Sequence, residues 1–170
     1  MILGLDVSTR TVGYSVVNGS GQVLLHGFID LSEYSGLMDK TVVVRNILAA
    51  IPYDIETVMI EKSLLAFSNG ASSAKTLQTL SAFNGIISWV CYELFATEPE
   101  YISATTARSM LGIKIPKGTK AKEAVMSWVM ANVPSFVPAK TKTGSIKKEC
   151  YDSADAIIVS LASHKLGEAQ

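Results

Sequence analysis

The sequence predicts an α/β fold in which helices flank a mixed five-stranded sheet, an antiparallel meander extended by parallel strands. The first thirty residues contain three β-rich runs joined by short turns, and the rest alternates helical periodicity with two short apolar runs. The chain has 170 residues, 48% of them hydrophobic, which suits one well-filled core. We therefore expect residues 1–170 to form a single domain.

The meander is predicted over residues 2–7, 12–17 and 23–30, because the breaks between these runs are short and rich in turn formers. A helical pattern over 38–51 and an apolar run over 57–61 follow. Since a helix precedes it, the run 57–61 can return parallel to the first strand through a right-handed crossover. The ends of these two strands then lie side by side at one edge of the sheet.

The remaining elements follow from the same patterns. A polar, basic stretch over 134–148 precedes the last of them. The predicted elements are a long helix from 72 or 73 to 95, a strand over 99–103, and helices over 105–111, 120–132 and 152–166.

Four carboxylates occupy positions where an uncompensated charge would be costly. Asp6 ends the first apolar run, Glu61 ends the run 57–61, and Asp152 and Asp155 open the last helix. Mg²⁺ prefers oxygen ligands, and an acid at the end of a buried strand is unfavourable unless a cation compensates it. We therefore expect these four side chains to form one metal site.

Simpler structural roles exist for three of these acids. Asp152 and Asp155 lie at i and i+3 on the first turn of the predicted helix and could serve as capping residues. Glu61 could form a surface ion pair with Lys62. For Asp6 the sequence offers only Arg10 as a nearby charge partner.

The net charge is zero, but the charges are unevenly distributed. Residues 101–150 contain nine Lys and Arg against two acids, a local charge of +7. A basic surface suits a phosphate backbone, although a solvated lysine-rich loop is the plainer interpretation. The basic residues of this segment are Arg108, Lys114, Lys117, Lys120, Lys122, Lys140, Lys142, Lys147 and Lys148.

Other classes are disfavoured by the sequence. No apolar run reaches the roughly 18 residues of a membrane span, and the N-terminus does not resemble a signal peptide, so a cytoplasmic or nucleoid-associated protein is expected. Two cysteines and two histidines, widely separated, argue against a metal bound by nitrogen and sulfur.

Four segments, taken in order, carry a family resemblance. They are residues 2–14 around Asp6, residues 59–62 around Glu61, Ala107-Arg108 with residues 122–125, and residues 151–157 followed by Ser163-His164. Together they resemble the RuvC-type Holliday junction resolvases of the ribonuclease H-like, or retroviral integrase, superfamily. The turn Val7-Ser8-Thr9 and the lysine-rich stretch 134–149 depart from the bacterial pattern and suggest a divergent, phage-type branch.

The resemblance implies a ribonuclease H-like fold and a crossover junction endodeoxyribonuclease. Two Mg²⁺ or Mn²⁺ ions per active site would support hydrolysis of a phosphodiester to 5′-phosphate and 3′-hydroxyl ends. Asp6 would bridge the ions, Glu61 and Asp155 would each hold one, and Asp152 would complete the set or orient water.

The resemblance also implies DNA contacts. Lys122 would contact a phosphate near the scissile bond, and a second basic residue of the family falls near Leu111. Phe67 lies where the family inserts an aromatic wedge into the junction, although a core phenylalanine is equally compatible with the sequence. The predicted DNA-binding residues are Lys122, Lys120, Lys117, Lys114, Arg10 and Phe67.

A homodimer is expected because a four-way junction is two-fold symmetric and needs two matched cuts. The helix 73–95 is the expected interface, unless its apolar residues only cover the sheet. Other functions remain open: a broader branched-DNA nuclease, a ribonuclease H acting on hybrids, and a non-catalytic DNA-binding module. A sugar-kinase or actin-like ATPase also begins with a Gly-x-Asp-x-Ser/Thr strand and turn, but it needs two such domains.

Overall fold

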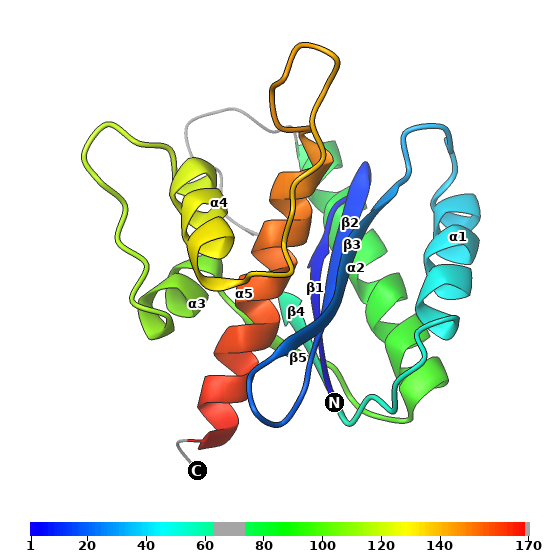
Figure 1. Ribbon diagram of the computed structural model, residues 1–170. Coiled ribbons are helices and arrows are strands. Elements are labelled where there is room, and N and C mark those ends of the chain that lie inside the picture. Colours follow the sequence, from blue (N-terminus) through cyan, green and yellow to red (C-terminus); the bar gives the residue numbers. More distant parts are fainter. Residues whose placement is uncertain (63–73, 169–170) are drawn as a thin grey trace.

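The computed structural model describes residues 1–62 and 74–168, and it contains one five-stranded sheet in the order β3-β2-β1-β4-β5 (Figure 1). β1, β2 and β3 form an antiparallel meander, and β4 and β5 extend the sheet in parallel from β1. The predicted mixed sheet is therefore confirmed. The strands are β1 (Ile2–Val7), β2 (Thr11–Val17), β3 (Val23–Asp30), β4 (Thr57–Glu61) and β5 (Glu100–Ile102).

Helices cover both faces of the sheet. In Figure 1, α1 and α2 lie on one side, while α3, α4 and α5 lie on the other. Two clusters of buried apolar side chains separate the sheet from these two helix layers. The helices are α1 (Leu37–Ala49), α2 (Ala74–Phe95), α3 (Ala104–Met110), α4 (Ala121–Asn132) and α5 (Glu149–Glu168).

The alternation of side chains along β1 decides which layer each residue faces. Leu3, Leu5 and Val7 are buried in the cluster that contains residues of α1 and α2. Gly4 and Asp6 therefore face the opposite layer, where α5 lies. A Cβ on Gly4 would approach backbone atoms of α5 to 2.6 Å, which shows how closely the helix lies against this strand.

Small residues on β2 extend this close contact. Gly13 pairs with Asp6 across the β1-β2 ladder, and a Cβ on Gly13 would overlap the backbone carbonyl of Asp152. Two residues farther along, the buried Ser15 hydroxyl accepts a hydrogen bond of 3.1 Å from Ser160. The small side chains therefore let α5 lie directly over the meander.

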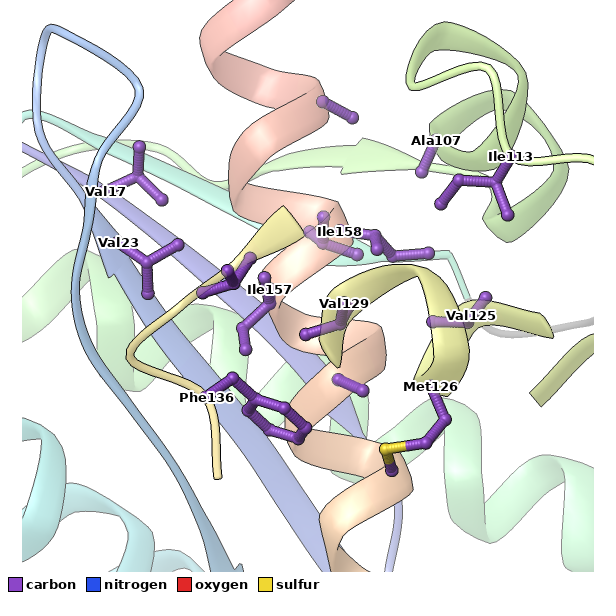
Figure 2. Close-up of a cluster of buried hydrophobic side chains, with 14 of the residues drawn as sticks. Val17, Val23, Ala107, Ile113, Val125, Met126, Val129, Phe136, Ile157 and Ile158 are labelled. Atoms are coloured by element: carbon purple, nitrogen blue, oxygen red, sulfur yellow. The ribbon is translucent and has the colours of Figure 1, made fainter. Parts of the chain in front are cut away.

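The layer of α3, α4 and α5 has its own core (Figure 2). Val125 and Val129 of α4 meet Ile157 and Ile158 of α5, and Phe136 closes the cluster from the segment that follows α4. This packing fixes α4 against α5. It thereby fixes the start of α4 relative to the sheet edge.

The final helix differs from its prediction. It begins at Glu149, not at residue 152, so Asp152 lies in its first turn and Asp155 in its second. The placement of both acids in the first turn was therefore wrong. Within the described residues, no helix combines the length and apolar character needed to cross a membrane.

Candidate metal centre

The strand register brings Asp6 and Glu61 to the same edge of the sheet. β1 and β4 are parallel, and their register pairs Leu5 with Ile60, so the two acids follow this pair by one residue each. The turn that follows Asp6 and joins β1 to β2 is closed by Ser8, whose hydroxyl donates to the Thr11 carbonyl at 2.8 Å. Both acids face the α5 layer, because Gly4 and Met59, two residues earlier, also face it.

Three of the four acids converge within reach of a single cation. Asp6, Asp152 and Asp155 can each offer a carboxylate oxygen such that these atoms all lie within 4.8 Å of one another. Glu61 lies outside this group, but its charge is the largest of the neighbouring charges that raise the pKa of Asp6. The charges of Glu61, Asp152 and Asp155 therefore all act on Asp6.

Within residues 1–62 and 74–168, Glu61 has no partner that would explain its burial. Its Oε2 atom is buried and forms no hydrogen bond within the described residues. The same part of the chain shows no ion pair between Glu61 and Lys62, so the proposed surface pair does not form. A buried carboxylate oxygen without a partner is costly, and a hard cation would remove this cost.

The pKa values of the cluster show the same unfavourable accumulation of charge. Burial, followed by the charge of Asp155, raises the pKa of Glu61 to about 7. Burial also raises the pKa of Asp155 to about 6, with Lys122 opposing the shift. The pKa of Asp6 lies well above its usual value because of burial and the charges of Glu61, Asp155 and Asp152. Divalent cations would favour the ionised form of all these groups.

Lys122 at the start of α4 lies directly beside the acids. Its Nζ donates to Asp152 Oδ1 at 3.1 Å and lies 3.8 Å from Asp155 Oδ2. Burial lowers the pKa of Lys122. The charge of Asp152 and this hydrogen bond, together with the other nearby acids, raise the pKa by more, so the net shift is upward. In this structure Lys122 compensates the carboxylates, a contact that its sequence position did not indicate.

No protein-family model and no curated protein matches the chain. A structure of Thermus thermophilus RuvC with a Holliday junction substrate matches with a TM-score of 0.70 and 13% identity, covering 99% of this chain and 94% of the other. The chain has a RuvC-like fold.

Two further resolvases share this fold. The yeast mitochondrial Holliday junction resolvase Ydc2 matches with a TM-score of 0.62 and 12% identity, covering 96% of this chain and 77% of the other. The fowlpox virus resolvase, solved with Holliday junction DNA, matches with a TM-score of 0.52 and 14% identity, covering 99% of each chain. The predicted ribonuclease H-like fold is therefore confirmed, and the RuvC-like fold spans almost the whole chain.

Helix capping does not account for the two acids of α5. Asp155 lies in the second turn and is only 8% exposed, so it cannot cap the first turn. The side chain of Asp152 accepts its hydrogen bond from Lys122. Asp155 of this chain is therefore a buried acid whose carboxylate lies near that of Asp6 at the sheet edge.

The predicted DNA-binding residues do not all lie beside the acids. Arg10 lines a hollow beside Lys122 and Asp152, and Lys120 is the N-cap residue of α4. Lys114 and Lys117 are exposed on the loop between α3 and α4, which extends away from α5 in Figure 1. Phe67 lies outside the described residues.

Arg108 of α3 lies in the predicted basic segment and in the resemblance segment Ala107-Arg108, but it was not among the predicted DNA-binding residues. Its charge lowers the pKa of both Glu61 and Asp155, so Arg108 acts electrostatically on the acids from α3. It lies one turn before Leu111, where the family's second basic residue was expected. The only available signal was the short segment Ala107-Arg108, which is too common to single out a residue.

Proposed function

We propose that the protein is a metal-dependent DNA endonuclease that resolves Holliday junctions by paired phosphodiester hydrolysis. The observation that carries this proposal is the convergence of Asp6, Asp152 and Asp155, with Glu61 beside them, at the sheet edge of a RuvC-like fold. Two of the similar structures contain Holliday junction DNA, which supports a branched substrate for this chain. We place such a protein in the cytoplasm, with access to nucleoid DNA.

The donor set fits hard divalent cations such as Mg²⁺ or Mn²⁺, because every candidate ligand is a carboxylate oxygen. We propose that two ions bind per active site. The chemistry supplied at such a site is activation of a water and stabilisation of the departing 3′-oxygen, which leaves 5′-phosphate and 3′-hydroxyl ends. Asp6, whose pKa is raised by burial and by the charges of all three other acids, would hold the cations that the cluster shares. Glu61 and Asp155 would each hold one ion, and Asp152 would complete the set or orient water.

Two basic side chains would position the DNA strand. Lys122 reaches the acids from α4, and Arg108 acts on them from α3, so they approach the cluster from two elements of the same layer. Such cations contact phosphate oxygens without reading the base sequence. Phe67 remains the predicted junction wedge, and Lys114, Lys117, Lys120 and Arg10 remain predicted backbone contacts.

Lower pH should stabilise the metal-free protein. Acids with raised pKa values in the folded chain bind protons more tightly there than in the unfolded chain, so their stabilising effect is lost as pH rises through about 6 to 7. We expect the metal-free Tm to fall by a few °C between about pH 5 and 8, since roughly 1 kcal/mol corresponds to about 2–4 °C at this size. Saturating Mg²⁺ should raise Tm more at the higher pH.

Scanning calorimetry with EDTA or Mg²⁺ measures this dependence, and Glu61→Gln is the matched variant. The variant should flatten the metal-free pH profile and lose part of the Mg²⁺ effect. Lowered pKa values are found for Asp30, Glu56 and Glu93. Their contribution to the pH dependence of stability therefore lies at more acidic pH. Equal Mg²⁺ effects at both pH values, in wild type and variant alike, would contradict the metal assignment.

A homodimer through α2 is part of the proposal. Trp89 is 62% exposed and Tyr92 is 57% exposed, and these aromatic residues share a helix face with the exposed small residues Ala82 and Gly85. A second copy would cover this face and place two active sites about a two-fold axis. We expect Trp89→Glu to yield a monomer that makes unpaired nicks.

Sedimentation equilibrium and nick mapping test the dimer together. Met130→Glu is the control, because Met130 is 49% exposed on α4 in the opposite helix layer. A wild-type protein that remains monomeric at high concentration would contradict the dimer. So would a Trp89→Glu variant that sediments as wild type does.

A substrate panel tests the function itself. The protein is incubated with a four-way junction, a replication fork, an RNA:DNA hybrid and a linear duplex, with and without Mg²⁺ or Mn²⁺. Cleavage confined to the junction supports the resolvase, and cleavage of forks as well supports a broader branched-DNA nuclease. Cleavage of the hybrid alone would overturn the proposal in favour of a ribonuclease H, and metal-independent binding without cleavage in favour of a DNA-binding module.

A further inference from the structure

The segment before α5 forms a small hairpin, residues 139–147, which we call the basic hairpin. The backbone amide of Lys147 donates to the Ala139 carbonyl at 2.9 Å, and Thr141 donates to Ser145 at 2.7 Å. Gly144 turns the chain with φ of 85°, a conformation that glycine adopts without strain. The hairpin therefore has a defined, backbone-paired shape.

The base of the basic hairpin is anchored in the core. Phe136 and Cys150, which flank it, are 6% and 4% exposed in the cluster that joins α4 to α5. Ile146 packs against the same cluster from within the hairpin. The hairpin is thus fixed to the N-terminal end of α5, where it forms the orange loop at the top of Figure 1.

The hairpin and the residue that follows it present a strongly positive surface. Residues 139–148 contain four exposed lysines and no acid, and none of these lysines forms an ion pair within the described residues. Thr141, Thr143 and Ser145 add exposed hydroxyl groups between them. The four lysines are Lys140, Lys142, Lys147 and Lys148.

A hollow connects this surface to the candidate metal centre. It has a volume of about 280 Å³ and is lined by residues that include Arg10, Lys122, Lys148, Tyr151 and Asp152. Three cations of this lining, Arg10, Lys122 and Lys148, face two acids, Glu149 and Asp152, and Lys148 joins the hollow to the basic hairpin. A nucleic-acid backbone that leaves the metal centre along this path would meet these three cations before it reaches the basic hairpin.

The composition of the hairpin indicates a duplex partner. Proteins that hold single strands supply aromatic rings for the bases to stack on, and residues 139–148 contain no aromatic residue. Lysines and hydroxyl groups are instead typical contacts to the phosphates of a duplex. We propose that the basic hairpin binds the phosphate backbone of a duplex arm that leads away from the cleavage point. This inference rests on the proposed function.

Replacement of all four lysines by glutamine tests the inference. The exposed lysines can be replaced without loss of core packing, because the hairpin is closed by backbone hydrogen bonds. Binding to a four-way junction is measured across salt concentrations, with Ca²⁺ in place of Mg²⁺. We expect the slope of log K against log salt to decrease in magnitude by about 3 to 4, because each phosphate contact contributes about 0.9.

Two further variants separate charge from other causes. The quadruple arginine variant should keep the wild-type slope, since it preserves the charges. Lys165→Gln removes one charge near the opposite end of α5 and should leave the slope unchanged. Hydroxyl-radical footprinting should show arm phosphates that the wild type protects and the glutamine variant leaves exposed.

The possible failures can be told apart. If the wild type binds and cuts the junction but the glutamine variant keeps its slope and footprint, the inference about the hairpin is overturned and the proposed function stands. If the wild type binds no branched DNA, both are overturned.

Discussion

Neutralising Asp6, Glu61 or Asp155 should abolish cleavage while leaving junction binding intact. Asp6→Asn, Glu61→Gln and Asp155→Asn preserve side-chain size but remove the negative charge that a divalent cation needs. Loss of a single charge-stabilising group in an active site costs about 10²–10³ in rate, and loss of a direct metal ligand should cost at least as much. Cleavage of a four-way junction and binding to it are measured in parallel.

Glu149→Gln is the matched control for this series. Glu149 is an acid in the first turn of α5, but it is not among the acids that converge on Asp6. The variant should cut at close to the wild-type rate. Near-normal cleavage by any one of the three cluster variants would contradict the assignment, as would a loss of DNA binding that matches the loss of cleavage.

Gly13→Ala should disrupt the site without touching a carboxylate. The added Cβ would overlap the backbone carbonyl of Asp152, which is not the end of a flexible side chain and cannot move aside alone. The start of α5 must therefore shift away from β2 and carry Asp152 and Asp155 with it. Overpacking of this kind costs about 1–3 kcal/mol, and we expect a value at the upper end together with a large loss of cleavage.

Gly19→Ala is the control, because a Cβ on Gly19 meets no atom of the described residues within 4 Å. Chemical denaturation gives the free energy of unfolding for both variants, and junction cleavage gives the functional effect. Excess Mg²⁺ should not rescue Gly13→Ala, because the carboxylate ligands are displaced, so cleavage should stay low at any metal concentration. A Gly13→Ala protein with wild-type stability and cleavage would show that α5 does not lie where this structure places it.

The sequence predicted the sheet because its strands carry strong local signals. The turns around Ser8 and Gly19 mark the hairpins of the meander, and the separation of the run 57–61 from the meander by a helix determined its parallel pairing. From this topology the convergence of Asp6 and Glu61 followed without any side-chain information. In the structure, Leu5 of β1 pairs with Ile60 of the parallel strand β4, and the two acids directly follow this pair.

Other features depend on contacts that a sequence does not contain. The first turn of α5 begins at Glu149, because Cys150 and Tyr151 already donate to the carbonyls of Lys147 and Lys148. That turn has no apolar periodicity to mark it. The early start moves Asp155 into the second turn and removes capping as its role.

The two basic residues near the acids, Lys122 and Arg108, likewise could not be assigned to the site from the sequence. Lys122 was expected to contact DNA, but its ion pairs with Asp152 and Asp155 arise only when α4 packs against α5. Arg108 reaches the site from α3, far from the acids in sequence. Local pattern identifies such residues as basic, whereas only the tertiary packing assigns them to a site.

The central claim is that the four carboxylates hold the divalent cations used for cleavage. Anomalous scattering from Mn²⁺ in crystals of the protein tests it most directly. We expect Mn²⁺ peaks bounded by Asp6, Glu61 and Asp155, and we expect Asp6→Asn crystals to lose them. Crystals in saturating Mn²⁺ that show no peak at this cluster, or peaks unchanged by Asp6→Asn, would contradict the account.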